Sequence, residues 1–275
     1  MKKRYLAYCL PFLLASCIEE PPIATEKAVI EGWINSDGYP VVIFTSSISP
    51  DEEDITLSDK IIRWGKVTIT DSVDSFTMTG GPDNDFFPPY RFISYQMKGE
   101  PGKTYKIRAE FKNLVAEAEC TMPMPTPIDR VEVLPIEDND SLRAATLYFT
   151  TPANCPSYYY LTIREAESGK QPLPAMLGTY KATTPGIEAS IPILHSKNHL
   201  NDDIFVPQLK IGEKLEISLC RISEEVYEFW SAYDNAVLFG GNQFFDSAQS
   251  LHGNIQGGYG VWSAQGVSRT TLLVE

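Results

Sequence analysis

The stretch Tyr105-Lys106-Ile107-Arg108-Ala109 alternates apolar and charged side chains, residue by residue. A period of two is typical of a β-strand that has one face in a core and the other in water. The stretch lies inside a longer β-type run at residues 103–111, and another run follows at residues 114–121. Both runs predict β-strands.

Similar runs precede this stretch, at residues 28–34, 41–44, 66–70, 75–79 and 90–97. Clusters of turn-forming residues separate them, such as Asn35-Ser36-Asp37-Gly38, which predicts a hairpin between the first two runs. About seven short strands in roughly a hundred residues are typical of an immunoglobulin-like β-sandwich. We therefore predict such a domain over residues 28–122.

Three prolines lie within Pro123-Met124-Pro125-Thr126-Pro127. They stiffen the backbone and remove hydrogen-bond donors, so this segment predicts a domain boundary. Further β-type runs follow at residues 130–134, 143–150, 158–164, 187–194, 214–222 and 267–274. The fold class predicted for the chain is all-β, with two β-sandwich domains, the second over residues 128–275.

One segment has the spacing of a helix instead. Ser223 is a suitable N-cap, and Glu224 and Glu225 follow in the first turn, where the helix dipole favours negative charge. One apolar face results from the helical spacing of Val226, Phe229, Trp230, Tyr233 and Val237. We expect an amphipathic helix near residues 224–239 that docks on the second domain and ends at Gly240-Gly241.

The amino terminus has the pattern of a secretion signal. Lys2, Lys3 and Arg4 precede an apolar stretch of eleven residues, Tyr5–Ala15. Eleven helical residues rise only ~16 Å, which is too short for the ~30 Å of a bilayer core. We therefore predict a signal peptide over residues 1–16.

The signal ends in Leu14-Ala15-Ser16-Cys17, which resembles a bacterial lipobox. In that class of signal the cysteine receives a diacylglycerol, and its amine is acylated after cleavage. Two or more acyl chains give stable membrane anchoring. We predict lipid attachment at Cys17, followed by a tether over residues 17–27.

The composition of the 275 residues narrows the possible functions. Hydrophobic residues make up 43% of the chain, which suffices for a sizeable core. The net charge of −13 argues against a nucleic-acid partner, because phosphate repels such a field.

Few residues suggest a chemical site. His195 and His199 have a spacing that would bring both imidazoles to one metal on a helix, but their surroundings are typical of a solvated loop, which is the favoured interpretation. The loop residues Phe86, Phe87 and Tyr90, beside two prolines, could contact a partner or ligand, or extend the core instead. The glycine-rich Gly257–Gly260 is interpreted as a tight turn. No catalytic residue and no cofactor is expected.

Cys120, Cys155 and Cys220 remain after the signal and the lipid cysteine. Three is an odd number, so at most one disulfide can form, and the sequence leaves its pairing open. All three are interpreted as small core residues.

The assembled motifs resemble a family of Bacteroidota lipoproteins known as domain of unknown function 4249. The resemblance rests on the lipobox, on Val29–Ile34, on Thr121–Pro125 and on two late segments, Ile222–Tyr227 and Gly253–Trp262. Tyr259 and Trp262 depart from the family pattern, where a smaller apolar residue and a phenylalanine are expected. The acidic Glu19 and Glu20, after Cys17, resemble the signal that exports lipoproteins of this phylum to the cell surface.

The family resemblance implies association with an outer-membrane TonB-dependent receptor. We therefore expect a non-enzymatic, surface-exposed accessory lipoprotein, anchored in outer-membrane lipid, that helps such a receptor capture or admit its substrate. Two alternatives remain open: an envelope scaffold or assembly lipoprotein, and a surface hydrolase of glycans or peptides.

Overall fold

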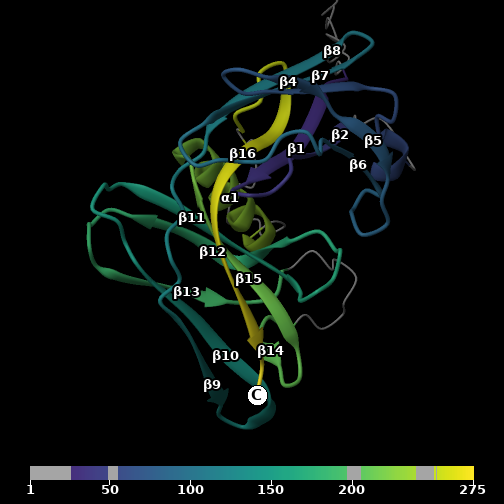
Figure 1. Ribbon diagram of the computed structural model, residues 1–275. Helices are drawn as coiled ribbons and strands as arrows, with labels where there is room; N and C mark the ends of the chain where they lie inside the picture. Colours follow the sequence, from purple (N-terminus) through teal and green to yellow (C-terminus); the bar gives the residue numbers. More distant parts are fainter. Residues whose placement is uncertain (1–25, 49–54, 197–205, 240–250, 252) are drawn as a thin grey trace, which may run out of the picture.

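A computed structural model describes residues 26–48, 55–196, 206–239, 251 and 253–275 (Figure 1). Strands dominate, which confirms the all-β prediction. In the described ranges, no helix reaches the length and apolarity that a bilayer crossing requires. The elements are β1 (Ala28–Asn35), β2 (Val41–Ser46), η1 (Leu57–Lys60), β3 (Lys66–Thr70), β4 (Ser75–Thr77), β5 (Thr79–Pro82), β6 (Tyr90–Ile93), β7 (Thr104–Phe111), β8 (Leu114–Thr121), β9 (Arg130–Ile136), β10 (Asn139–Thr150), β11 (Ser157–Glu165), β12 (Leu173–Ala182), β13 (Glu188–Ile193), β14 (Leu209–Lys210), β15 (Lys214–Ile222), α1 (Glu224–Phe239) and β16 (Gly258–Leu273).

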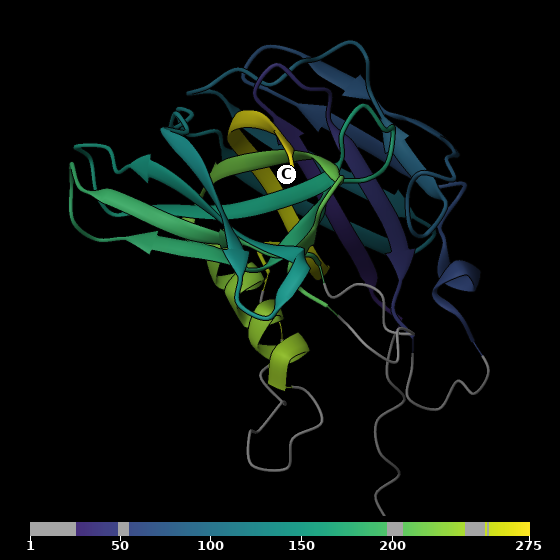
Figure 2. The same cartoon turned by 90° about the horizontal axis from the view of Figure 1, so that it is seen from below.

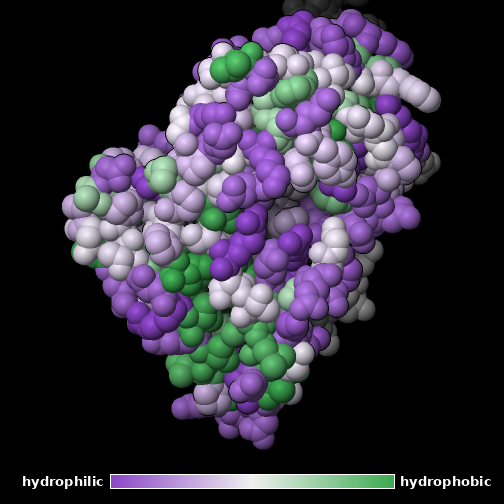
Figure 3. Space-filling model, in the orientation of Figure 1, coloured by the Kyte–Doolittle hydropathy of each residue, from purple (hydrophilic) through white to green (hydrophobic). Residues whose placement is uncertain are grey.

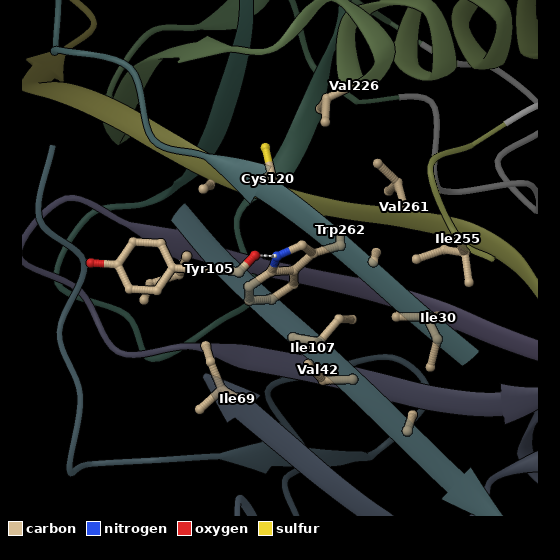
Figure 4. Close-up of a cluster of buried hydrophobic side chains, with 14 of the residues drawn as sticks. Ile30, Val42, Ile69, Tyr105, Ile107, Cys120, Val226, Ile255, Val261 and Trp262 are labelled. Carbon is tan, nitrogen blue, oxygen red and sulfur yellow. Dashed lines mark hydrogen bonds between the residues drawn. The ribbon is translucent and has the colours of Figure 1, made fainter. Parts of the chain in front are cut away.

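The alternating stretch at residues 105–109 forms the middle of β7 and buries the side predicted. Tyr105, Ile107 and Ala109 are at most 2% exposed, whereas the charged residues between them face solvent. Their core surrounds Trp262, which is fully buried and donates from Nε1 to the backbone oxygen of Tyr105 at 3.0 Å (Figure 4). The indole thus fills this core and also satisfies its one donor.

Strand β16 joins the two halves of the molecule. Its first half, from Gly258 to Gln265, pairs in parallel with β1, and its second half, from Gly266 to Leu273, pairs antiparallel with β15. The result is one sheet in the order β12-β11-β15-β16-β1-β2-β6-β5. In Figure 1 this long yellow strand runs from the upper body, which contains β1–β8, down into the lower body, which contains β9–β15.

Two smaller sheets complete the layers. Sheet β4-β3-β7-β8 covers the β1 side of the long sheet and encloses a first core, while β13, β10, β14 and β9 cover the β11–β15 side and enclose a second core. The cores correspond largely to the sequence regions before and after residues 123–127. However, residues 258–265 come from the second region and pair within the sheet of the first. The two predicted domains therefore share a strand.

The predicted helix spans Glu224–Phe239 and contacts β11, β12 and β16 (Figure 2). The backbone N–H of Val226 donates to Ser223 Oγ at 3.4 Å, which confirms the predicted cap. Val226, Phe229 and Trp230 are buried and belong to the first core. The side chain of Val237 and the predicted stop at Gly240-Gly241 lie outside the described residues.

Two glycines allow β16 to take this path. Gly260 has φ +105°, and a Cβ at this position would lie 1.9 Å from the backbone oxygen of Ile30 on β1. Gly266 lies where β16 changes partner, and its Cβ would lie 2.3 Å from the backbone oxygen of Pro123. The proline segment thus crosses close over β16 at the junction of the two bodies. The interpretation of residues 257–260 as a tight turn holds only for Gly257, because Gly258–Gly260 open β16 and pair with β1.

Candidate functional site

The three aromatic residues suggested as contacts have different environments. Phe86 is 9% exposed, stacks on Trp33 with ring centroids 6.2 Å apart, and lies under the guanidinium of Arg91. Tyr90 is half-buried and its hydroxyl donates to the backbone oxygen of Arg63 at 3.0 Å. Phe87 is 67% exposed. Of the three, Phe87 is therefore the ring that is available to a partner.

His195 has a protein partner. Its Nε2 lies 3.0 Å from Glu213 Oε2, and both side chains are partly buried. His199 lies outside the described residues, as does Cys17. Within the part of the chain that the structure describes, no group of three or more histidine, cysteine or acidic side chains is arranged to hold a metal ion.

Cys120, Cys155 and Cys220 are all free thiols. Cys120 and Cys220 are buried in the first core, and Cys155 packs against the second. Burial raises the pKa of the Cys220 thiol to about 12 and also raises that of Cys120. Their environments are those of small core side chains, as interpreted from the sequence.

A cavity of about 60 Å³ lies between the two bodies. Its walls come from strands of both halves and from the helix. The residues that line it are Glu31, Trp33, Asn35, Tyr160, Thr162, Arg164, Pro172, Pro174, Glu216, Ser218, Trp230, Val261, Ser263, Gln265 and Arg269.

Strand periodicity explains why these residues share one space. On β1, Ile30 and Ile34 enter the first core, so the alternate residues between them point to the other side of the sheet. On β11, Leu161 and Ile163 enter the second core, so Thr162 and its alternate neighbours also point away from it. The polar part of the cavity wall therefore comes from strand faces that turn away from these cores, and Tyr160, Trp230 and Val261 of the first core complete the wall.

Gln171 links the two bodies beside the cavity. Its backbone N–H donates to the backbone oxygen of Asp85 at 2.9 Å, and its side-chain oxygen accepts from the backbone N–H of Phe87 at 3.3 Å. Its Nε2 donates to Glu31 Oε1 at 3.2 Å. The loop that carries Phe87 is thus connected to a carboxyl group in the cavity wall through one side chain.

The charged groups of the cavity are largely compensated or neutralised. Arg164 Nη2 lies 2.8 Å from Glu216 Oε1, and Arg269 Nε lies 3.7 Å from the same oxygen. Glu31 forms no ion pair with a cation of the described residues, and burial raises its pKa from 4.5 to about 7. Near neutral pH a substantial fraction of Glu31 is therefore protonated.

Trp230 and Tyr160 form one aromatic wall. Their rings stack with centroids 5.5 Å apart and an interplanar angle of 9°. The Tyr160 hydroxyl accepts from Gln265 Nε2 at 2.8 Å, within the buried part of the wall. This contact fixes side chains of β11, β16 and α1 relative to one another.

Four buried polar atoms lack a hydrogen-bond partner in the described part of the protein, and all four belong to residues of the cavity wall. They are Asn35 Oδ1, Arg164 Nε, Trp230 Nε1 and Ser263 Oγ. An unsatisfied buried polar group costs about 1–3 kcal/mol, so native proteins rarely accumulate them without a reason. Their concentration in the residues of one cavity wall makes this wall the candidate site for a solute or for bound water that would satisfy them.

Polar residues on several strands are the sequence signal for this site. Glu31, Ser263, Gln265, Thr162 and Ser218 are polar residues on one side of strands that are otherwise apolar. Taken alone, each strand has the pattern of a strand with one face in a core and the other in solvent. The pairings of β1 with β16, of β16 with β15 and of β15 with β11 bring their polar sides together.

A family model described as Domain of unknown function (DUF4249) matches residues 17–271. No curated protein matches the chain.

Proposed function

The chain belongs to the family described as domain of unknown function 4249, and we propose that it is a non-enzymatic, lipid-anchored envelope protein that captures a small polar solute for an outer-membrane TonB-dependent receptor. The observation that carries the solute-capturing role is the cavity between the two bodies, with its four unpartnered polar atoms. The anchor and the receptor rest on the lipobox at Cys17 and on the family resemblance.

A tether favours such a role physically. A lipid-anchored protein meets a receptor in the same membrane at a high effective concentration, so weak contacts are sufficient to hold the pair together. The mature globule needs only a modest contact surface. Phe87, which is exposed and connected to the cavity through Gln171, is the residue we place in that contact.

The hydrolase alternative gains no comparable support. His195 pairs with Glu213, and neither residue lines the cavity. The scaffold alternative predicts protein partners without a solute, and the partner experiment separates it from the proposal.

A photo-crosslinking amino acid placed at residue 87 in intact cells is expected to capture a TonB-dependent receptor. Leu134 on β9 is the matched control, because it is similarly exposed, at 59%, but lies in the lower body. Figure 3 shows apolar side chains gathered over that body too, so apolar exposure alone would capture partners at both positions. Mass spectrometry of the adducts that finds only assembly machinery at residue 87, or the same partners at both positions, contradicts the proposal.

Cys17→Ala is expected to move the protein from the membrane fraction to the soluble fraction. The reason is that no diacylglycerol can be attached without the thiol, and each buried lipid methylene contributes about 0.8 kcal/mol to anchoring. Fractionation and immunoblotting measure the shift. The matched control is Cys9→Ala, which alters a cysteine inside the predicted signal and leaves the lipobox intact. Retention of the Cys17→Ala protein in the membrane would refute the anchor.

A further inference from the structure

We propose that the cavity binds a neutral polyhydroxylated solute, either a small polyol or the terminal ring of a sugar. This deepens the solute-capturing function proposed above and rests on it. The inference starts from the four polar atoms, in residues of the cavity wall, that have no partner among the residues the structure describes.

A ligand that forms hydrogen bonds with all four atoms must offer both donors and acceptors. Trp230 Nε1 and Arg164 Nε can only donate, whereas Asn35 Oδ1 can only accept. Ser263 Oγ can do either. A simple anion has no proton for Asn35, and a metal or quaternary cation has no acceptor for Trp230. A hydroxyl group serves both kinds of atom.

The charged groups of the cavity wall also favour a neutral ligand. Glu216 contacts both Arg164 and Arg269, so these arginines do not present free positive charge. Glu31 accepts from Gln171 Nε2 and shares the cavity wall with the aromatic side chains of Tyr160 and Trp230. Its facing groups are thus aromatic or amide side chains. An anion would lose its hydration there without gaining a free counter-charge, and a cation would have to ionise the buried Glu31 first.

The remaining walls suit the C–H groups of a polyol. Pro172, Pro174 and Val261 contribute apolar surface between the polar groups. The volume of about 60 Å³ has room for roughly four to six water-sized groups. This accommodates a few hydroxyl-bearing carbons, so a larger sugar would insert one end and leave the rest outside.

The test is a titration of the full-length protein, purified in a detergent that has no sugar headgroup. Saturation-transfer NMR would measure binding of four probes: glycerol, D-glucose, sodium acetate and tetramethylammonium chloride. Glycerol, glucose or both are expected to bind. Glycerol alone would identify a polyol site, and glucose alone a sugar-end site. Binding of acetate or tetramethylammonium in their place, or of no probe, overturns the proposal.

Variants locate the binding in the cavity. Trp230→Phe keeps an aromatic ring and removes the donor, and is expected to raise Kd about fivefold, the effect of one lost hydrogen bond. Ser263→Ala is expected to act in the same direction, and serves if Trp230→Phe fails to fold. Trp64→Phe is the matched control, because Trp64 is 90% exposed and does not line the cavity. Equal affinities in the wild type and in a folded Trp230→Phe or Ser263→Ala protein contradict the assignment.

The outcomes also separate this inference from the function on which it rests. Receptor adducts at residue 87 without binding of either hydroxylated probe would overturn the ligand class alone. Binding of glycerol or glucose without receptor adducts would overturn the receptor role and leave the ligand class standing.

Discussion

Gly260→Ala is expected to lower the free energy of unfolding by about 4 kcal/mol, a large share of the ~5–15 kcal/mol that stabilises a typical domain. The backbone of Gly260 has φ +105°, which an alanine adopts only with strain. The added Cβ would also lie 1.9 Å from the backbone oxygen of Ile30, so β16 would have to move away from β1. Because β16 pairs with β1 in one body and with β15 in the other, this displacement disturbs the whole long sheet. Urea denaturation followed by circular dichroism measures the loss.

Gly102→Ala is the matched control for this prediction. Gly102 also has a positive φ, +87°, but a Cβ there meets nothing within 4 Å. Its substitution by alanine is expected to lower the free energy of unfolding only by the strain of a positive φ, about 1–2 kcal/mol. Equal losses in the two variants would show that the close approach of β16 to β1 is not what requires Gly260.

In the wild type, the buried Glu31 is expected to lower the free energy of unfolding by about 3 kcal/mol at high pH, and Glu31→Gln is expected to remove this loss. Burial raises the pKa of Glu31 from 4.5 to about 7, so the folded state binds more protons than the unfolded state between these values. The stability of the wild type therefore falls as pH rises through this window and stays lower above it. Glutamine has no charge to bury, so at pH 8 the variant is expected to be more stable than the wild type, and near pH 4 equally stable.

Urea titrations of both proteins at pH 4 and pH 8 measure this difference. Glu228→Gln is the control, because Glu228 is an exposed glutamate on α1. It is expected to change the stability similarly at both pH values. A Glu31→Gln protein whose advantage does not grow with pH would contradict the burial of this carboxyl group.

Local periodicity predicted the individual elements well. The alternation at residues 105–109 identified which side of β7 is buried, and Ser223 identified the start of α1. Each of these features depends on neighbours within a few residues. In contrast, β12 (Leu173–Ala182) was not predicted. It contains Pro174 and Gly178, Leu177 has a positive φ, and its register with β11 shifts. Such irregularity removes the period of two.

The candidate site could not be predicted in the same way. Asn35 was assigned to a turn, yet it ends β1 and lies in the cavity wall. Ser263 lies more than two hundred residues away and becomes its neighbour only through the parallel pairing of β1 with β16. Local patterns show which side of a strand is polar. They do not show which distant strand lies beside it, and the cavity depends entirely on that pairing.

Mass spectrometry of the amino-terminal peptide, from protein isolated from its native membrane, determines whether this two-core β protein acts from a lipid anchor in the cell envelope. The predicted result is a peptide that begins at Cys17 and carries a diacylglyceryl group and an acylated amine. A peptide that still begins at Met1, or a Cys17 without lipid, would contradict both the anchor and the receptor-associated role built on it.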